Sequence, residues 1–163
     1  IYQEWFGLSK GHFSGLFAAN VGMMAVLNLL NRRLLLSYPS TMLLRIGVLV
    51  QFAAMLALVA TAWLGAPYWV VAGCIIVGVG CMGAIIPNNM ANALEYFPHL
   101  GGTASALLGA TQFTFAGIIS ALSATYAGDA LLPIVLTMAI CSLGAVTLAL
   151  GAPRAVAREV EAG

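Results

Sequence analysis

Carboxamide side chains are the polar groups that lie deepest in the apolar stretches of this sequence. Asn88 and Asn92 follow Pro87 within one such stretch. Asn20 lies in an earlier stretch and Gln112 in a later one. An amide donates and accepts hydrogen bonds but does not titrate near neutral pH. These residues could therefore bind an amphiphilic ligand, but they could not carry protons.

Two interpretations stay open for these amides. In one, they hydrogen-bond between helices, which contributes about 0.6 kcal/mol apiece in membrane proteins. In the other, they line a wet cavity, because a carboxamide in hydrocarbon is costly unless it faces the bundle interior or water. Asn88 and Asn92 are four residues apart and so share one helix face. We predict a substrate cavity lined by Asn20, Asn88, Asn92 and Gln112.

Pro87 and the small residues around it predict a hinge. Proline has no N–H, so Pro87 cannot donate the helical hydrogen bond to the carbonyl of Gly83, and the helix should kink there. Gly109 stands four residues after Ser105, a small-xxx-small spacing that lets backbones approach closely. We therefore predict hinge or packing roles for Pro87, Gly83 and Gly109, with static packing as the alternative to movement.

The sequence offers no group for catalysis or proton transfer inside its apolar stretches. Glu4, Glu95 and Asp129 all lie at the ends of these stretches, whereas a proton relay needs a titratable group within the membrane. The three cysteines lie in apolar surroundings without further ligands nearby. No nucleophile–base pair, phosphate-binding loop or metal motif occurs. We expect no enzyme activity, no metal, no cofactor and no nucleic-acid partner.

Composition identifies the elements that position these residues. The chain of 163 residues is 62% hydrophobic and only 7% charged, against roughly 25% charged in a soluble domain. A bilayer core about 30 Å thick needs about 20 apolar residues per helix. The sequence thus predicts an all-α polytopic membrane protein with five transmembrane helices, at residues 13–30, 42–64, 69–94, 103–127 and 132–150.

Charge predicts the orientation of these helices. Short connectors force antiparallel neighbours, so the connectors alternate between the two sides of the membrane. Five of the six Lys and Arg residues fall on one side, namely Arg32, Arg33, Arg45, Arg154 and Arg158. Positive residues gather on the cytoplasmic side. We therefore expect a multi-pass protein of the cell inner membrane, with residues 151–163 as a cytoplasmic tail.

One block of the sequence resembles a known family. The similarity lies in Pro87-Asn88-x2-Ala91-x-Ala93-Leu94-Glu95-x-Phe97-Pro98-His99-x-Gly101-Gly102-Thr103-Ala104-Ser105-Ala106-Leu107-Leu108-Gly109-Ala110-x-Gln112-Phe113. This run resembles the Bcr/CflA multidrug efflux transporters of the major facilitator superfamily. The opening Tyr2-Gln3-Glu4-x2-Phe6-Gly7-Leu8-Ser9 and the stretch Phe13-x2-Leu16-Phe17-Ala18-x-Asn20-x-Gly22-Met23-Met24 resemble the segment that leads into the eighth helix of that family.

The resemblance implies that residues 1–163 form part of the C-terminal six-helix half of a twelve-helix major facilitator fold. It implies proton-driven export of drugs, with the bilayer, a small drug-like molecule, protons and a missing N-terminal half as partners. One feature departs from the superfamily. The connector at residues 31–36 keeps Arg but lacks the Asp of the usual loop motif. Separately, no signal peptide is visible at the start of the sequence, and we expect the chain to be a piece of a longer protein. We expect the proton-carrying residue to lie in the missing half.

The predicted function is therefore secondary active export of drugs or other small amphiphiles, by proton antiport and alternating access. Two alternatives remain. One is a major facilitator permease for a sugar or metabolite, although such a solute usually needs charged or densely hydrogen-bonding groups. The other is a truncated membrane protein that does not transport.

Overall fold

The protein is described by a computed structural model that places residues 10–127 and 131–151. These residues form six helices and no strands: α1 Lys10–Leu34, α2 Ser40–Trp63, α3 Tyr68–Gly80, α4 Met82–Leu94, α5 Gly101–Ala127 and α6 Leu131–Gly151. Helices α3 and α4 follow one another as a single apolar span. The described residues thus contain five helices long and apolar enough to cross a membrane, as the composition predicted.

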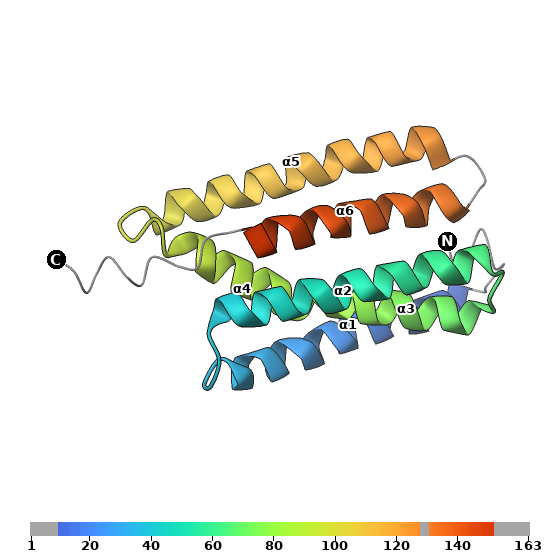
Figure 1. Ribbon diagram of the computed structural model, residues 1–163, viewed down its shortest axis with the longest axis horizontal. Helices are drawn as coiled ribbons and strands as arrows, with labels where there is room; N and C mark the ends of the chain where they lie inside the picture. The colour runs from blue at the N-terminus through green and yellow to red at the C-terminus, as the bar shows by residue number, and fades with distance from the viewer. Residues whose placement is uncertain (1–9, 128–130, 152–163) are drawn as a thin grey trace.

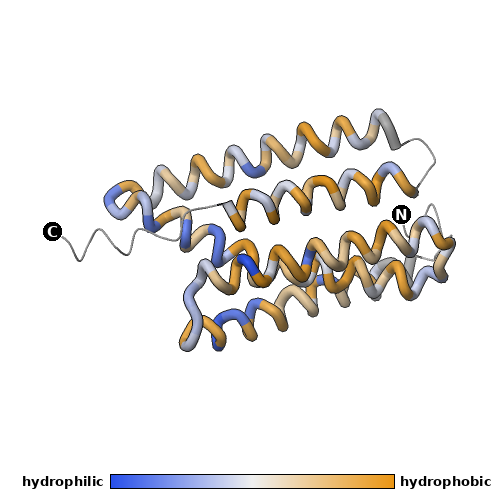
Figure 2. Tube along the Cα trace, viewed as in Figure 1, coloured by the Kyte–Doolittle hydropathy of each residue, from blue (hydrophilic) through white to orange (hydrophobic). Residues whose placement is uncertain are grey.

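The helices run back and forth between two ends of an elongated bundle (Figure 1). One end, which we call the Arg-bearing end, holds the α1–α2 connector, the α4–α5 connector and the last turn of α6. Arg32 and Arg33 lie in the last turn of α1 at this end. The hydrophilic stretches of the chain also gather toward this end (Figure 2).

The opposite end contains the turn between α2 and α3. Gly65 has a φ of 65°, the left-handed conformation that glycine adopts at low cost after a helix. The N–H of Ala66 reaches back to the carbonyl oxygen of Thr61 at 3.0 Å, and Pro67 then leads into α3. Trp63 and Trp69 beside this turn are exposed. Exposed aromatic side chains at a helix end are typical of a membrane interface.

The apolar core lies between α2, α3 and α6. Its buried members are Met55, Leu58, Val71, Ala72, Ile75, Val135 and Ala139. Gly78 of α3 lies against the methyl group of Met55, so a Cβ at this position would overlap that group. The helices therefore approach closely where glycine or alanine faces a longer apolar side chain.

The third span is divided into α3 and α4 at Cys81, within the single helix predicted for residues 69–94. The division is slight, because Cys81 keeps a helical backbone, its N–H donates to the carbonyl oxygen of Val77 at 3.0 Å, and its carbonyl oxygen accepts from Ile85 at 2.9 Å. Pro87 lies inside α4, which continues past it. The ring of a proline crowds the carbonyl four residues earlier, so the backbone adjusts on the N-terminal side. Gly78, Gly80 and Gly83 make that side easy to distort because glycine has a low helix propensity.

The first helix is longer than predicted at its C-terminal end. The sequence predicted a helix at residues 13–30, but α1 continues to Leu34, past Arg32 and Arg33. Arginine has a high helix propensity and is favoured by the helix dipole in a last turn. This extra turn places Asn31 inside the helix, where its side chain can face a neighbour.

Candidate functional site

A pair of amides joins α1 to α4 in the half of the bundle nearer the Arg-bearing end. Asn88 donates from Nδ2 to Oδ1 of Asn31 at 2.7 Å, and Asn31 donates from Nδ2 to Oδ1 of Asn88 at 3.3 Å. Asn88 is 1% exposed and Asn31 is 4% exposed. Each amide therefore satisfies one donor and one acceptor of the other, which lets both be buried.

A second amide contact compensates for Pro87. The carbonyl of Gly83 receives no hydrogen bond from position 87, because proline has no N–H. Nδ2 of Asn28 donates to this carbonyl oxygen at 3.0 Å. The approach is close because Gly83 has no side chain: a Cβ there would overlap the backbone carbonyl oxygen of Met24. The chain thus replaces a missing backbone hydrogen bond by a side chain from the neighbouring helix.

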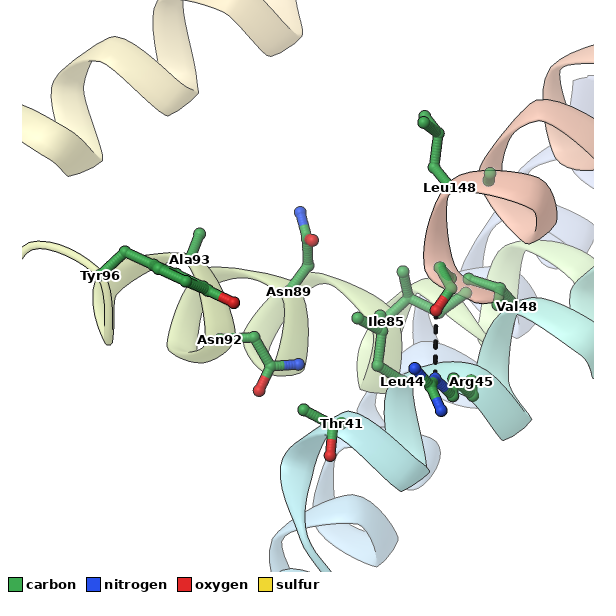
Figure 3. Close-up of a pocket in the computed structure, with 12 residues that line it drawn as sticks. Thr41, Leu44, Arg45, Val48, Ile85, Asn89, Asn92, Ala93, Tyr96 and Leu148 are labelled. Atoms are coloured by element: carbon green, nitrogen blue, oxygen red, sulfur yellow. Dashed lines mark hydrogen bonds between the residues drawn. The ribbon is translucent and has the colours of Figure 1, made fainter. Parts of the chain in front are cut away.

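A cavity of about 480 Å³ lies between α2, α4 and α6 (Figure 3). This volume is within the range of about 300–1,000 Å³ typical of small-molecule sites. The residues that line it are Thr41, Leu44, Arg45, Val48, Ile85, Asn89, Asn92, Ala93, Tyr96, Ala145, Leu148 and Ala149. The lining includes one cation and no carboxylate.

Two side chains of this cavity are fixed by polar contacts. Nε of Arg45 donates to the backbone carbonyl oxygen of Ala149 at 3.1 Å, which ties α2 to the last turn of α6. Oδ1 of Asn92 accepts a hydrogen bond from the hydroxyl of Ser40. Nδ2 of Asn92 is enclosed and has no hydrogen-bond partner among the described residues. In Figure 3 this nitrogen points toward the α2 wall of the cavity.

A second cavity, of about 500 Å³, lies along α5 and α6. It is lined by Ala116, Ile119, Ser120, Ser123, Ala124, Ile134, Thr137, Met138 and Cys141. The α5 segment at residues 111–120 is exposed at every position, and Phe113 is 78% exposed. The hydroxyl groups of Thr111 and Thr114 donate to carbonyls of α5 itself. The exposed segment is therefore apolar apart from the amide of Gln112 and the hydroxyl group of Ser120.

The four predicted cavity residues fall in four different environments. Asn92 lines the α2–α4–α6 cavity, and Asn88 is engaged with Asn31. Gln112 lies on the exposed part of α5. Asn20 is half-buried on α1, and its Oδ1 is enclosed without a hydrogen-bond partner among the described residues. The structure does not bring these four side chains together.

The predicted packing residues also differ from one another. Gly83 lies against α1 as described, whereas a Cβ on Gly109 would meet nothing within 4 Å among the described residues. Sequence reasoning gave no role to Asn28 or Arg45 beyond polarity and charge. The missing N–H of Pro87 was the one signal that could have called for a partner such as Asn28. Nothing in the sequence indicated that Arg45 would contact the carbonyl of Ala149.

The polar groups of the described residues form contacts between helices and line cavities, without a cluster of titratable groups. Among residues 10–127 and 131–151, no three His, Cys, Asp or Glu side chains come together to hold a metal ion. What the described chain offers is amide contacts between helices, the α2–α4–α6 and α5–α6 cavities and an exposed segment on α5.

Comparison with known proteins identifies the family of this chain. A family described as Major Facilitator Superfamily matches residues 1–121. The chain is also 31% identical over 141 residues to a bicyclomycin resistance protein homolog of Haemophilus influenzae. That alignment covers 86% of the chain and 35% of the relative, so the chain spans about a third of the length of the curated relative it matches. No solved structure matches the chain significantly.

Proposed function

The chain belongs to the major facilitator superfamily, and on that premise we propose that it serves a Bcr/CflA-type transporter that exports drug-like amphiphiles. The observation that carries this proposal is the similarity to a relative named for bicyclomycin resistance, over 86% of the chain. The resemblance in residues 87–113 supports the same group. The five apolar spans make the protein a multi-pass membrane protein.

We place the energy source outside the described residues. Glu95 is the only carboxylate among them, and it lies exposed in the turn after α4. A carboxylate at a helix end cannot relay protons through the middle of a bilayer. If transport is proton antiport, the carrier belongs to the part of the transporter that corresponds to the unaligned length of the relative.

The uncovered face of α5 supports alternating access. A helix exposed on all sides at residues 111–120 needs a partner or lipid, and most of the relative's length lies outside the aligned region. The remaining part of the transporter would pack across α5 and enclose the α5–α6 cavity. Substrate would then contact Gln112 and the hydroxyl groups of Ser120 and Ser123, as alternating access needs a site between two moving parts.

Helix α4 supplies the moving element in this proposal. Its N-terminal end lies at the boundary with α3 at Cys81, and the carbonyl of Gly83, which Pro87 leaves without a backbone donor, accepts from the side chain of Asn28. A side-chain hydrogen bond can be broken and remade as helices shift, at a net cost of about 1 kcal/mol. The reciprocal Asn31–Asn88 pair favours the packing interpretation for Asn88, in which it keeps α4 attached to α1 during the movement.

We orient the bundle with the Arg-bearing end in the cytoplasm of a bacterial cell. Arg32, Arg33 and Arg45 all lie toward this end, and positive residues gather on the cytoplasmic side. The predicted cytoplasmic tail at residues 151–163 lies almost wholly outside the described residues. In this proposal the membrane is the inner one, and α6 ends in the cytoplasm.

Transport by the full-length protein in sealed vesicles tests the proposal. We expect uptake of a fluorescent drug into inverted vesicles when a proton gradient is present, and collapse of uptake when an ionophore removes the gradient. Bicyclomycin should compete with the fluorescent drug, whereas sugars should not. Transport of a sugar with no effect of any drug would replace drug export by the permease alternative.

A further inference from the structure

We propose that the cavity between α2, α4 and α6 is a binding site for the phosphate headgroup of an anionic phospholipid. This site is separate from the proposed drug path along α5, and its occupant comes from the leaflet at the Arg-bearing end. The inference uses the orientation proposed above only to name that leaflet as the cytoplasmic one.

The depth of the cavity matches the depth of a headgroup. Helix α2 has 24 residues and is therefore about 36 Å long, so each end projects about 3 Å beyond a hydrocarbon core of about 30 Å. Arg45 lies five residues after the first residue of α2, about 7.5 Å along its axis. The guanidinium stem can extend outward from there to the headgroup level.

The polar residues of the lining all lie toward the helix ends, beside the apolar Leu44, Ala93, Leu148 and Ala149. Thr41, Arg45, Asn89, Asn92 and Tyr96 all lie within about 8 Å of a helix end, measured along the helix axes. The three deepest lining residues, Val48, Ile85 and Ala145, are apolar. A headgroup at the outer level would contact the polar lining residues, and the start of an acyl chain at the inner level would contact the apolar ones.

The polar part of the lining favours an acceptor with negative charge. Nδ2 of Asn92 is an enclosed donor without a described partner, although Oδ1 of the same side chain is engaged with Ser40. An enclosed N–H without an acceptor costs about 1–3 kcal/mol. This nitrogen is closed off from the cavity, so a phosphate oxygen would accept from it after a turn of the side chain. Arg45 is the one cation of the lining, and its contact with Ala149 holds the guanidinium at the cavity wall.

The surroundings favour a lipid over a soluble phosphate. Leu148, which lines the cavity, is 77% exposed, and in a membrane an exposed leucine on α6 faces hydrocarbon or another helix. Basic pockets between transmembrane helices on the cytoplasmic side are sites for anionic headgroups. A soluble anion would leave the half-buried Ile85 and Ala145 partly uncovered, whereas an acyl chain would cover them.

Lipid binding to the purified full-length protein tests the site. The protein in zwitterionic detergent would be titrated with phosphatidylglycerol, and bound lipid would be counted by native mass spectrometry. We expect saturable binding, weakened about fivefold in Arg45→Gln, since one basic residue contributes about 1 kcal/mol to attraction of an anionic lipid. Asn92→Asp keeps the acceptor for Ser40 and replaces the donor by a negative charge, so it should weaken binding at least as much.

Matched controls separate the possible occupants. Arg33→Gln removes a charge from the same end of the bundle without altering the cavity lining, and it should leave this site unchanged. Phosphatidylcholine and inorganic phosphate should each bind more weakly than phosphatidylglycerol. Equal binding of inorganic phosphate would overturn the lipid assignment, and equal weakening by Arg33→Gln would show only a diffuse surface effect. Because bound lipid is counted directly, these outcomes do not depend on whether the protein transports drugs.

Discussion

Two halves of this bundle are held together by different chemistry. Near the turn at Gly65, the contact between α2, α3 and α6 consists of apolar side chains centred on Leu58, which is 0% exposed. Toward the Arg-bearing end, α4 is attached to its neighbours by amides, through Asn28, Asn31 and Asn92. The apolar half fixes helices by shape, whereas the amide half fixes them by a few directional contacts.

The difference indicates which half can move. Interdigitated apolar contacts are lost together when helices slide, because each side chain fits one position only. A hydrogen bond between side chains can be exchanged for another partner or for water. The amide half is therefore suited to rearrangement, and the apolar half to serving as its fixed base. Four substitutions test this contrast, beginning with the largest expected effect.

Gly83→Ala should be the most damaging single change. Its Cβ would overlap the backbone carbonyl oxygen of Met24, which cannot rotate away as a side chain can. We expect a loss of about 3 kcal/mol of stability, measured by thermal unfolding in detergent. Gly73→Ala is the matched control, since nothing lies within 4 Å of a Cβ there among the described residues. Equal stability of both variants would mean that α1 and α4 are farther apart than described.

Leu58→Ala should destabilise the apolar half by about 2 kcal/mol, at the lower end of the range for buried leucines, because lipid is as apolar as leucine and only packing is lost. Thermal unfolding measures the loss. Drug transport per folded molecule should be unchanged, since Leu58 belongs to the fixed base. A lower transport rate at full folding would place movement in this half as well.

Asn88→Ala should cost about 1–2 kcal/mol, because it leaves the buried amide of Asn31 without a partner. Replacing both residues by leucine should recover part of this loss. A double-mutant cycle on unfolding, built from the two single alanine variants and the double alanine variant, gives the coupling between Asn31 and Asn88. The double variant should also transport more slowly if exchangeable amides permit movement of α4. Additive losses without coupling would argue that the pair contributes nothing jointly.

Gln112→Ala should have the smallest effect on stability, below about 0.5 kcal/mol, because it lies on the exposed part of α5. Its effect should appear in the drug profile, measured as the ratio of transport rates for two drugs of different polarity. Phe113→Ala provides a neighbouring comparison on the same exposed segment. If the ratio stays constant while expression falls, Gln112 belongs to packing.

The sequence predicted the spans well and the contacts poorly, for physical reasons. Bilayer thickness requires long charge-free stretches, so the five spans could be found from composition. The boundary between α3 and α4 at Cys81 could not, because it falls six residues before Pro87, the residue that signals a bend. Asn31 was assigned to a connector because arginines followed it. The contact between Arg45 and Ala149 joins residues 104 positions apart, and no local pattern indicates such a pairing.

The substitution of a side-chain amide for a backbone amide at Gly83 has an evolutionary consequence. Asn28 has a reason to be an amide there only while position 87 lacks an N–H. If a related chain regains an N–H at 87, the carbonyl of residue 83 has a donor within its own helix, and position 28 is released to become apolar. Positions 28 and 87 should therefore covary among relatives, and position 83 should stay glycine as long as Asn28 reaches across.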